Sequence, residues 1–138
     1  MSSIFTRIIN REIPASIVYE DDICIAILDI DPVQKGHTLV IPKQELAWMD
    51  DYDDVTVAHC MIVTKKLMKH MKTVLADIVV VYLIVEWLEV PHWHTHVIPY
   101  TQTPNHSTGV TKQPYALGEQ DQYLQLLHTD LSQMKDLS

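Results

Sequence analysis

The stretch PHWHTHVIPY (residues 91–100) places His92, His94 and His96 at every second position. Successive side chains of a β-strand point to opposite faces, so a strand carries all three imidazoles on one face, whereas a helix scatters them. The flanking residues are mostly aromatic or β-branched, which favours a strand. Three imidazoles on one face suit metal binding or acid, base and nucleophile chemistry, because imidazole titrates near neutrality. The alternative is chance clustering on a solvated strand.

The bulk composition predicts one compact domain over residues 1–138. Of the 138 residues, 47% are hydrophobic and 20% charged, so the chain can build a core. The formal net charge of −8 argues against a nucleic-acid or anionic-membrane partner, although a local basic site can still hold a phosphate. The longest apolar run, residues 78–85, is too short to span a bilayer, and the N-terminus has no signal-peptide core. We therefore expect a cytoplasmic protein.

The two cysteines, Cys24 and Cys60, stand in otherwise apolar or helical contexts. We expect two buried thiols, which suits a cytoplasmic protein, and a disulfide is the alternative. Glycine occurs at only three positions, so no glycine-rich phosphate loop is present.

The apolar patterns and turn residues predict a short helix, three strands, a long helix, two strands and a final amphipathic helix. This order indicates the α+β class with an antiparallel sheet. The first strand after the long helix is apolar without alternation, so we expect it to be central and covered on both faces. The predicted ranges are a helix over 3–13, strands over 16–20, 23–29 and 37–43, a helix from the acidic residues 50–54 to residue 75, strands over 77–86 and 91–100, and a helix over 119–134.

Several separate pieces of the sequence resemble the histidine triad (HIT) family of nucleotide hydrolases and transferases. The family signature is His-φ-His-φ-His-φ-φ, with φ hydrophobic, and residues 92–98 fit it except for the polar Thr95. The resemblance covers residues 3–100 and is specific because several pieces agree in order and spacing. The other matching pieces are REIPA (11–15), VYEDD (18–22), LDIDP (28–32) and GHTLVIPK (36–43).

The resemblance implies a fold: a five-stranded antiparallel sheet with one long central helix and a C-terminal helix. It also implies a homodimer in which two such sheets join into one of ten strands. Residues 3–100 carry the motifs, and residues 101–138 add a polar loop and the last helix of the same HIT-like domain.

The resemblance also implies roles for four histidines. His94 corresponds to the nucleophile that attacks the α-phosphorus of a nucleotide, and the backbone carbonyl of His92 orients its ring. His96 corresponds to the residue that contacts the phosphate, and His37 to a supporting histidine close to the triad.

The family binds a purine nucleotide, AMP-like or GMP-like. By resemblance, Asp29 holds the ribose hydroxyls, Ile30 lies beside it, and Glu89 belongs to the nucleotide site. A carboxylate suits a ribose diol because it can accept two hydrogen bonds. For Asp29 alone, a turn-forming role ahead of Pro32 fits equally well, and the surrounding match favours the functional role.

The chemistry that these residues imply is hydrolysis of purine nucleoside phosphoramidates or related nucleotidyl substrates. A neutral imidazole displaces the leaving group and forms a nucleotidyl-histidine intermediate, which water cleaves to a nucleoside monophosphate. No cofactor is expected.

The loop before the triad departs from the family pattern. Trp87 stands in a glycine place, Leu88 in a glutamine place and Glu89 in a serine, threonine or glutamate place. Leu88 cannot donate a hydrogen bond to the scissile bridge as glutamine does. The alternative is therefore a nucleotide-binding HIT-like protein with little or no catalytic activity.

A second departure concerns metal. Some family members bind zinc through two N-terminal cysteines, a later histidine and a triad histidine, and Ser3, Thr6 and Glu45 replace the first three here. Hydroxyl groups do not substitute for thiolates on zinc, so no metal is expected at that place. A different zinc site remains an alternative, because His-x-His on a strand is a common ligand pair.

Overall fold

The structure is a computed structural model that describes residues 2–86, 88–105 and 111–131. Helices and strands follow the predicted order, with a short 3-10 helix, η1, added before the long helix. The elements are α1 (Ile4–Ile9), β1 (Ile17–Glu20), β2 (Cys24–Leu28), β3 (Thr38–Pro42), η1 (Met49–Asp51), α2 (Asp54–Val74), β4 (Val80–Glu86), β5 (His94–Tyr100) and α3 (Glu119–Leu127).

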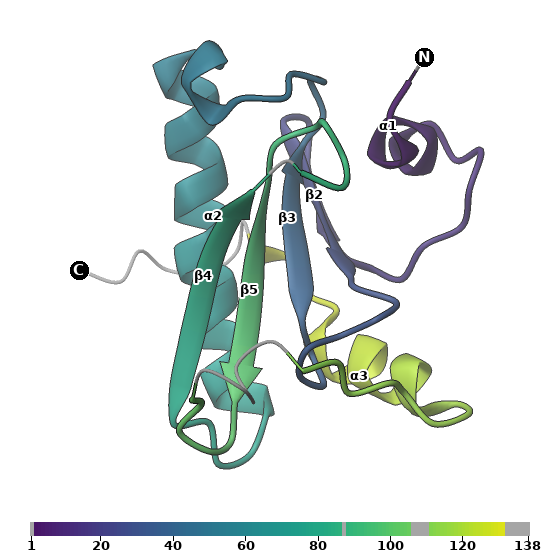
Figure 1. Cartoon of the computed structure of the whole chain (residues 1–138), viewed down its shortest axis with the longest axis vertical. Coiled ribbons are helices and arrows are strands. Elements are labelled where there is room, and N and C mark those ends of the chain that lie inside the picture. Colours follow the sequence, from purple (N-terminus) through teal and green to yellow (C-terminus); the bar gives the residue numbers. More distant parts are fainter. Residues whose placement is uncertain (1, 87, 106–110, 132–138) are drawn as a thin grey trace.

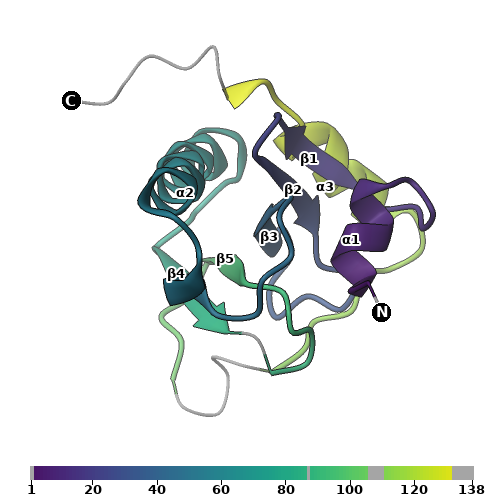
Figure 2. The ribbon, with the colours of Figure 1, turned by 90° about the horizontal axis from the view of Figure 1, so that it is seen from above.

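The five strands form one antiparallel sheet in the order β1-β2-β3-β5-β4 (Figure 1). The predicted α+β class with a five-stranded antiparallel sheet and one long helix is confirmed. Figure 2 shows α2 on one side of the sheet and α1 on the other. The sheet therefore separates two packing regions, and the histidine motif belongs to the side of α1.

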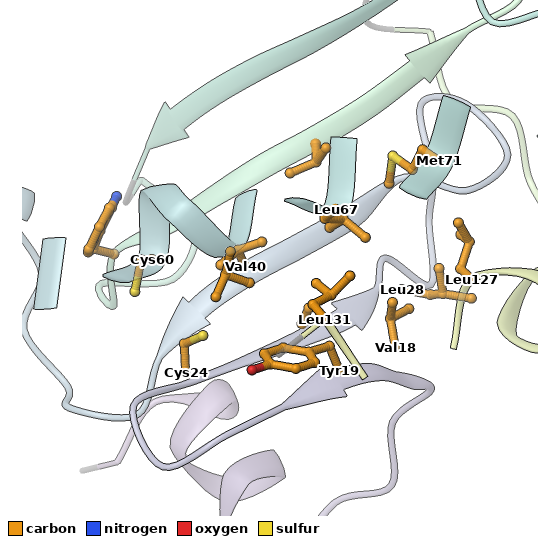
Figure 3. Packing of buried hydrophobic residues seen from close by; sticks show 14 of the residues in the cluster. Val18, Tyr19, Cys24, Leu28, Val40, Cys60, Leu67, Met71, Leu127 and Leu131 are labelled. Carbon is orange, nitrogen blue, oxygen red and sulfur yellow. The ribbon is translucent and has the colours of Figure 1, made fainter. Parts of the chain in front are cut away.

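The main core lies between the sheet and α2 (Figure 3). Val40 of β3 and Leu67 of α2 are buried at its centre. Cys24 and Cys60 lie in the same core as buried free thiols, as the sequence predicts. Asp53 caps the start of α2, because its side chain accepts a hydrogen bond from the backbone N–H of Thr56.

The first helix is shorter than the pattern predicts. It ends at Ile9, whereas the expected end lies just before Pro14. Arg11 adopts a φ of 63°, a left-handed conformation that cannot continue a helix. The segment after α1 turns at residues 10–13, and its Ile13, Pro14 and Ala15 line the cavity described below.

Strand β4 corrects a second expectation. The apolar stretch 77–86 predicts a central strand, but β4 is the edge strand, because β5 takes the place beside β3. Tyr82, Leu83, Ile84 and Val85 have exposed fractions between 36% and 45%. Within a single chain, the prediction that this strand is central and covered on both faces is therefore wrong.

The last helix is also shorter than predicted, because α3 ends at Leu127. Leu131 is nevertheless buried in the main core, as its place in the amphipathic pattern predicts. Met134, which the same pattern includes, lies outside the described residues. Within the described part of the chain, none of the helices combines the length and apolar character that a membrane crossing requires.

The loop that leads into β3 turns at Gly36. Its φ is +91°, and a Cβ at this position would lie 3.1 Å from the side-chain Cδ1 of Leu75. The left-handed backbone favours glycine here, and a side chain would also have to displace the end of the Leu75 side chain. The tight turn brings His37 directly to the start of β3 and below the histidine motif.

Candidate active site

The three motif histidines lie where β5 begins, against α1. β5 starts at His94, and His92 lies on the link just before it. His92 and His94 are buried, and the His96 side chain is 17% exposed. The ring of Phe5 packs edge-on against His92 and His94, with centroid distances of 5.7 and 4.9 Å. The predicted strand with imidazoles on one side is confirmed from His94 onward.

His94 is held in one orientation. Its Nδ1–H donates to the backbone carbonyl of His92 at 2.8 Å. Because a carbonyl oxygen can only accept, Nδ1 must carry a proton. The other nitrogen, Nε2, faces the Oε1 of Glu86 at 2.9 Å.

A chain of hydrogen bonds assigns the proton of His96. The backbone N–H of Val33 donates to Nδ1 of His37 at 3.0 Å, so the proton of a neutral His37 is on Nε2. Burial lowers the pKa of His37 to about 3, which keeps it neutral. Its Nε2–H donates to Nδ1 of His96 at 2.8 Å. Burial, followed by the charge of His94, also lowers the pKa of His96, whose proton therefore lies on Nε2 and points toward Glu86, 3.5 Å away.

Glu86 is a site residue that the sequence reasoning missed. It is the last residue of β4 and pairs directly with His94 in the sheet, so the two side chains share a face. The sequence contained a feature that could have predicted this role. Glu86 is the only charged residue in the stretch 78–86, and antiparallel pairing of that stretch with the histidine strand brings it beside the motif. The sequence analysis treated Glu86 only as the end of an apolar strand.

Asp29 lies just after β2, and its carboxylate is close to His37 and His96. Its backbone N–H donates to the carbonyl of His37 at 2.9 Å. Its Oδ1 accepts from the backbone N–H of Asp31 at 2.9 Å, so it does form the turn that the sequence allows. Burial raises the pKa of the Asp29 carboxyl group. Its Oδ2 lies 3.6 Å from Nε2 of His37, which ties Asp29 to the histidines.

One cavity of about 460 Å³ brings most of the predicted residues together. Its lining includes Asp29, Ile30, Glu89, His94 and His96. His37 and His92 are not among its lining residues and support it from behind. The apolar wall comes from α1, the segment after it and the sheet: Ile4, Phe5, Ile8, Ile13, Pro14, Ala15, Ile27, Leu28, Leu39 and Val90.

The charges around this cavity are mostly negative. Asp29, Asp31, Glu86 and Glu89 line it, and Lys112 is the only lysine or arginine among the described lining residues. The Lys112 ammonium group donates to the backbone carbonyl of Asp31 at 3.0 Å. An anionic ligand thus meets four carboxylates and a single cation.

The loop between β4 and the motif differs from the glutamine-bearing loop of the family. Leu88 is 85% exposed and is not among the lining residues of the cavity, whereas Glu89 is. Trp87 lies outside the described residues. Leu88 therefore neither donates a hydrogen bond to a ligand in this cavity nor fills it.

The place of the family's zinc ligands contains a hydrogen-bond network. The Oγ of Ser3 lies 2.7 Å from Nδ1 of His92, and Nε2 of His92 donates to the carbonyl of Pro42 at 2.8 Å. Burial lowers the pKa of His92, so the ring is neutral and its Nδ1 accepts a hydrogen bond from the Ser3 hydroxyl. The Thr6 hydroxyl and the Ser3 backbone N–H both donate to Glu45, at 2.5 and 2.7 Å. Hydroxyls that already have partners do not fit zinc.

We expect no stoichiometric zinc in the purified protein. The nitrogen of His92 that a metal would need already accepts a hydrogen bond from Ser3. Elemental analysis after dialysis against a chelator measures the metal content. One zinc per chain that survives dialysis contradicts the expectation, and loss of that zinc in Ser3→Ala would place it at this network.

Among the described residues, three groups of side chains have the spacing of metal ligands: Asp21, Cys24 and His59 form one, and the other two lie at the histidine motif. Glu86, His94 and His96 form one group, and Asp29, His37 and His96 form the other, with ligand atoms within 4.8 Å of one another. A metal needs a nitrogen lone pair. In the tautomers assigned above, the facing nitrogens of His37 and His96 carry protons, so neither group fits a metal ion as it stands.

Comparisons with known proteins find relatives of this chain. The HIT domain family profile matches residues 10–103. The chain is 42% identical to an uncharacterized HIT-like protein of Methanocaldococcus jannaschii over 99 residues, which cover 70% of this chain and 77% of that protein. It is 36% identical over 96 residues to the adenosine 5'-monophosphoramidase of Saccharomyces cerevisiae, covering 70% of this chain and 61% of that enzyme.

Solved structures share the fold over nearly the whole chain. A zinc-bound histidine triad family protein from Mycobacterium smegmatis superposes with a TM-score of 0.77 at 27% identity, covering 96% of this chain and 95% of that one. A hypothetical histidine triad nucleotide-binding protein from Sulfolobus tokodaii also gives a TM-score of 0.77 at 27% identity, with 93% and 91% coverage.

Proposed function

Because this chain belongs to the histidine triad family, we propose that it is a nucleotidyl hydrolase, which cleaves purine nucleoside phosphoramidates or related nucleotidyl substrates to a nucleoside monophosphate. The observation that carries the proposal is the orientation of His94. Its Nδ1–H is held by the carbonyl of His92 at 2.8 Å, and its Nε2 faces a cavity of about 460 Å³. A ring fixed in this way presents one nitrogen to a bound substrate.

The proposed reaction has two steps. The lone pair on Nε2 of His94 attacks the α-phosphorus, the bond from phosphorus to the leaving amine breaks, and the amine departs with a proton taken from solvent. Water then attacks the same phosphorus and returns a proton to solvent, the P–N bond to His94 breaks, and the nucleoside monophosphate is released. The Nε2–H of His96 is a donor for a phosphoryl oxygen in both steps, which stabilises the charge that develops there.

The other predicted residues have supporting roles in this proposal. The Asp29 carboxylate accepts from the ribose hydroxyls, and Ile30 and the apolar wall contact the purine. His37 holds His96 in its donor tautomer through the 2.8 Å hydrogen bond. Glu89 lines the nucleotide cavity close to the motif. No cofactor takes part.

The proposal is tested by turnover of an adenosine 5'-phosphoramidate, followed as release of AMP. Rapid acid-free quenching and mass spectrometry should detect a nucleotidyl adduct on the peptide that contains His94. Turnover without this adduct, or an adduct on another residue, contradicts the role of His94.

A nucleotide-binding protein with little turnover is the second candidate. The exposed Leu88 favours it, because this side chain offers no hydrogen bond to a leaving group. Calorimetry with AMP separates the two candidates when it is set beside steady-state turnover. Binding of AMP without measurable release of product supports the second candidate.

We also propose that two copies pair through β4 into a ten-stranded sheet. β4 is an edge strand with four exposed apolar or aromatic side chains, and such edges promote pairing. Light scattering at micromolar concentration should give the mass of a dimer. Leu83→Lys on β4 should shift it toward the monomer, whereas Leu126→Lys, a matched exposed position on α3, should not. A wild-type monomer contradicts this proposal.

The remaining predictions concern the chain as a whole. A single domain over residues 1–138, a cytoplasmic location and the lack of a nucleic-acid or membrane partner stay predictions.

A further inference from the structure

Glu86 lies where the reacting phosphate has to be placed. A phosphorus atom under attack must approach Nε2 of His94 at close range, and the Oε1 of Glu86 is already 2.9 Å from that nitrogen. The same oxygen is 3.5 Å from Nε2 of His96. Both nitrogens that the proposed reaction turns toward a phosphate therefore converge on one carboxylate oxygen.

The hydrogen-bond partners explain why this contact is stable. The Nδ1–H of His94 donates a hydrogen bond to the carbonyl of His92, so a neutral His94 would turn a lone pair on Nε2 toward the Glu86 oxygen. Two acceptors do not stay 2.9 Å apart unless a proton lies between them. The second partner, His96, brings its own proton on Nε2. In the ligand-free site Glu86 thus accepts hydrogen bonds from two imidazoles.

We propose that Glu86 is a specificity-determining residue, an internal anion that occupies the phosphate position at His94 and disfavours ligands in proportion to the negative charge on their phosphate. This inference rests on the proposed function. It adds a selection rule for that site: a phosphoramidate, with one negative charge on the reacting group, is accepted more readily than AMP, whose phosphate carries up to two. The same repulsion speeds release of the monophosphate product.

The position of Glu86 allows it to leave without unfolding the sheet. It is the last residue of β4, and its side chain is 28% exposed, so rotation toward solvent breaks no strand pairing. It then remains close to the bound phosphate. Asp29, Asp31 and Glu89 add to the negative charge of the cavity. Lys112 already contacts Asp31, so it offsets little of the repulsion between Glu86 and a bound phosphate.

The test compares two ligands that differ only in the phosphate. Calorimetry measures adenosine and AMP on wild type, Glu86→Gln and Glu86→Asp at about pH 8, where the AMP phosphate is dianionic. Glu86→Gln removes the charge and keeps the shape, so AMP should bind about tenfold more tightly, while adenosine affinity stays within about twofold. Glu86→Asp keeps the charge and should remain close to wild type for both ligands. Glu12→Gln changes an exposed carboxylate outside the cavity and should alter neither.

The results decide whether Glu86 disfavours ligands with a charged phosphate. Unchanged or weaker AMP binding in Glu86→Gln overturns the inference, and so does an equal gain for adenosine and AMP, which indicates a structural effect. A wild type that binds neither ligand overturns the proposed function itself, independently of the ratio between variants.

Discussion

Replacing His94 with alanine should reduce turnover of an adenosine phosphoramidate by at least about a thousandfold, because the substitution removes the attacking nitrogen. The fold should survive. His94 contacts Phe5 and the His92 carbonyl but lies outside the main core, so we expect a loss of about 1–3 kcal/mol in the free energy of unfolding. Steady-state kinetics and thermal unfolding measure the two effects.

Two further variants separate loss of chemistry from loss of the site. His94→Gly should still bind nucleotide, because Asp29 and the apolar wall remain. His96→Ala should slow turnover less than His94→Ala, since it removes a donor and leaves the nucleophile. If wild type shows clear turnover and His94→Ala retains it in contaminant-free preparations, the nucleophile is misassigned and the metal alternative gains weight.

Replacing Asp29 with alanine should weaken AMP binding without unfolding the chain. Loss of a charged acceptor from a pair of ribose hydroxyls costs on the order of 1.5–3 kcal/mol, or roughly a tenfold to 150-fold rise in Kd. Calorimetry with AMP measures this change. An unchanged Kd would remove Asp29 from the nucleotide site.

Asp29→Asn is the matched control for the turn. The asparagine oxygen can still accept from the backbone N–H of Asp31, which the Oδ1 of Asp29 does at 2.9 Å. We therefore expect wild-type stability together with reduced AMP affinity, because one of the two acceptor oxygens has become a donor. Full loss of stability in Asp29→Ala but not in Asp29→Asn would show that the turn is the main role of this residue.

Local pattern was sufficient for most of the fold. The spacing of His92, His94 and His96, the β-branched runs and the acidic start of the long helix identified the elements in their correct order, because periodicity and capping act over a few residues. The ends of α1 and α3 were misplaced. Arg11 ends α1 because its backbone is left-handed, and an arginine side chain does not predict a positive φ.

The position of β4 shows what local pattern omits. An apolar run predicts that a strand is buried, but it does not predict which strands pair with it. The register of β5 decides this, because β5 pairs with β3 on one side and leaves β4 at the edge. The exposed apolar face that results motivates the proposed dimer.

For the site, the sequence by itself determined which residue types are present and that His92, His94 and His96 alternate. Resemblance to a known motif also predicted Asp29, Ile30 and Glu89 as nucleotide-site residues, and all three line the cavity. Only the tertiary structure decided which nitrogen of each imidazole carries a proton, because the partners that settle it are a backbone carbonyl at His92 and a backbone N–H at Val33. It also brought Glu86 to 2.9 Å from His94 through strand pairing, a contact between residues eight positions apart that no local period encodes.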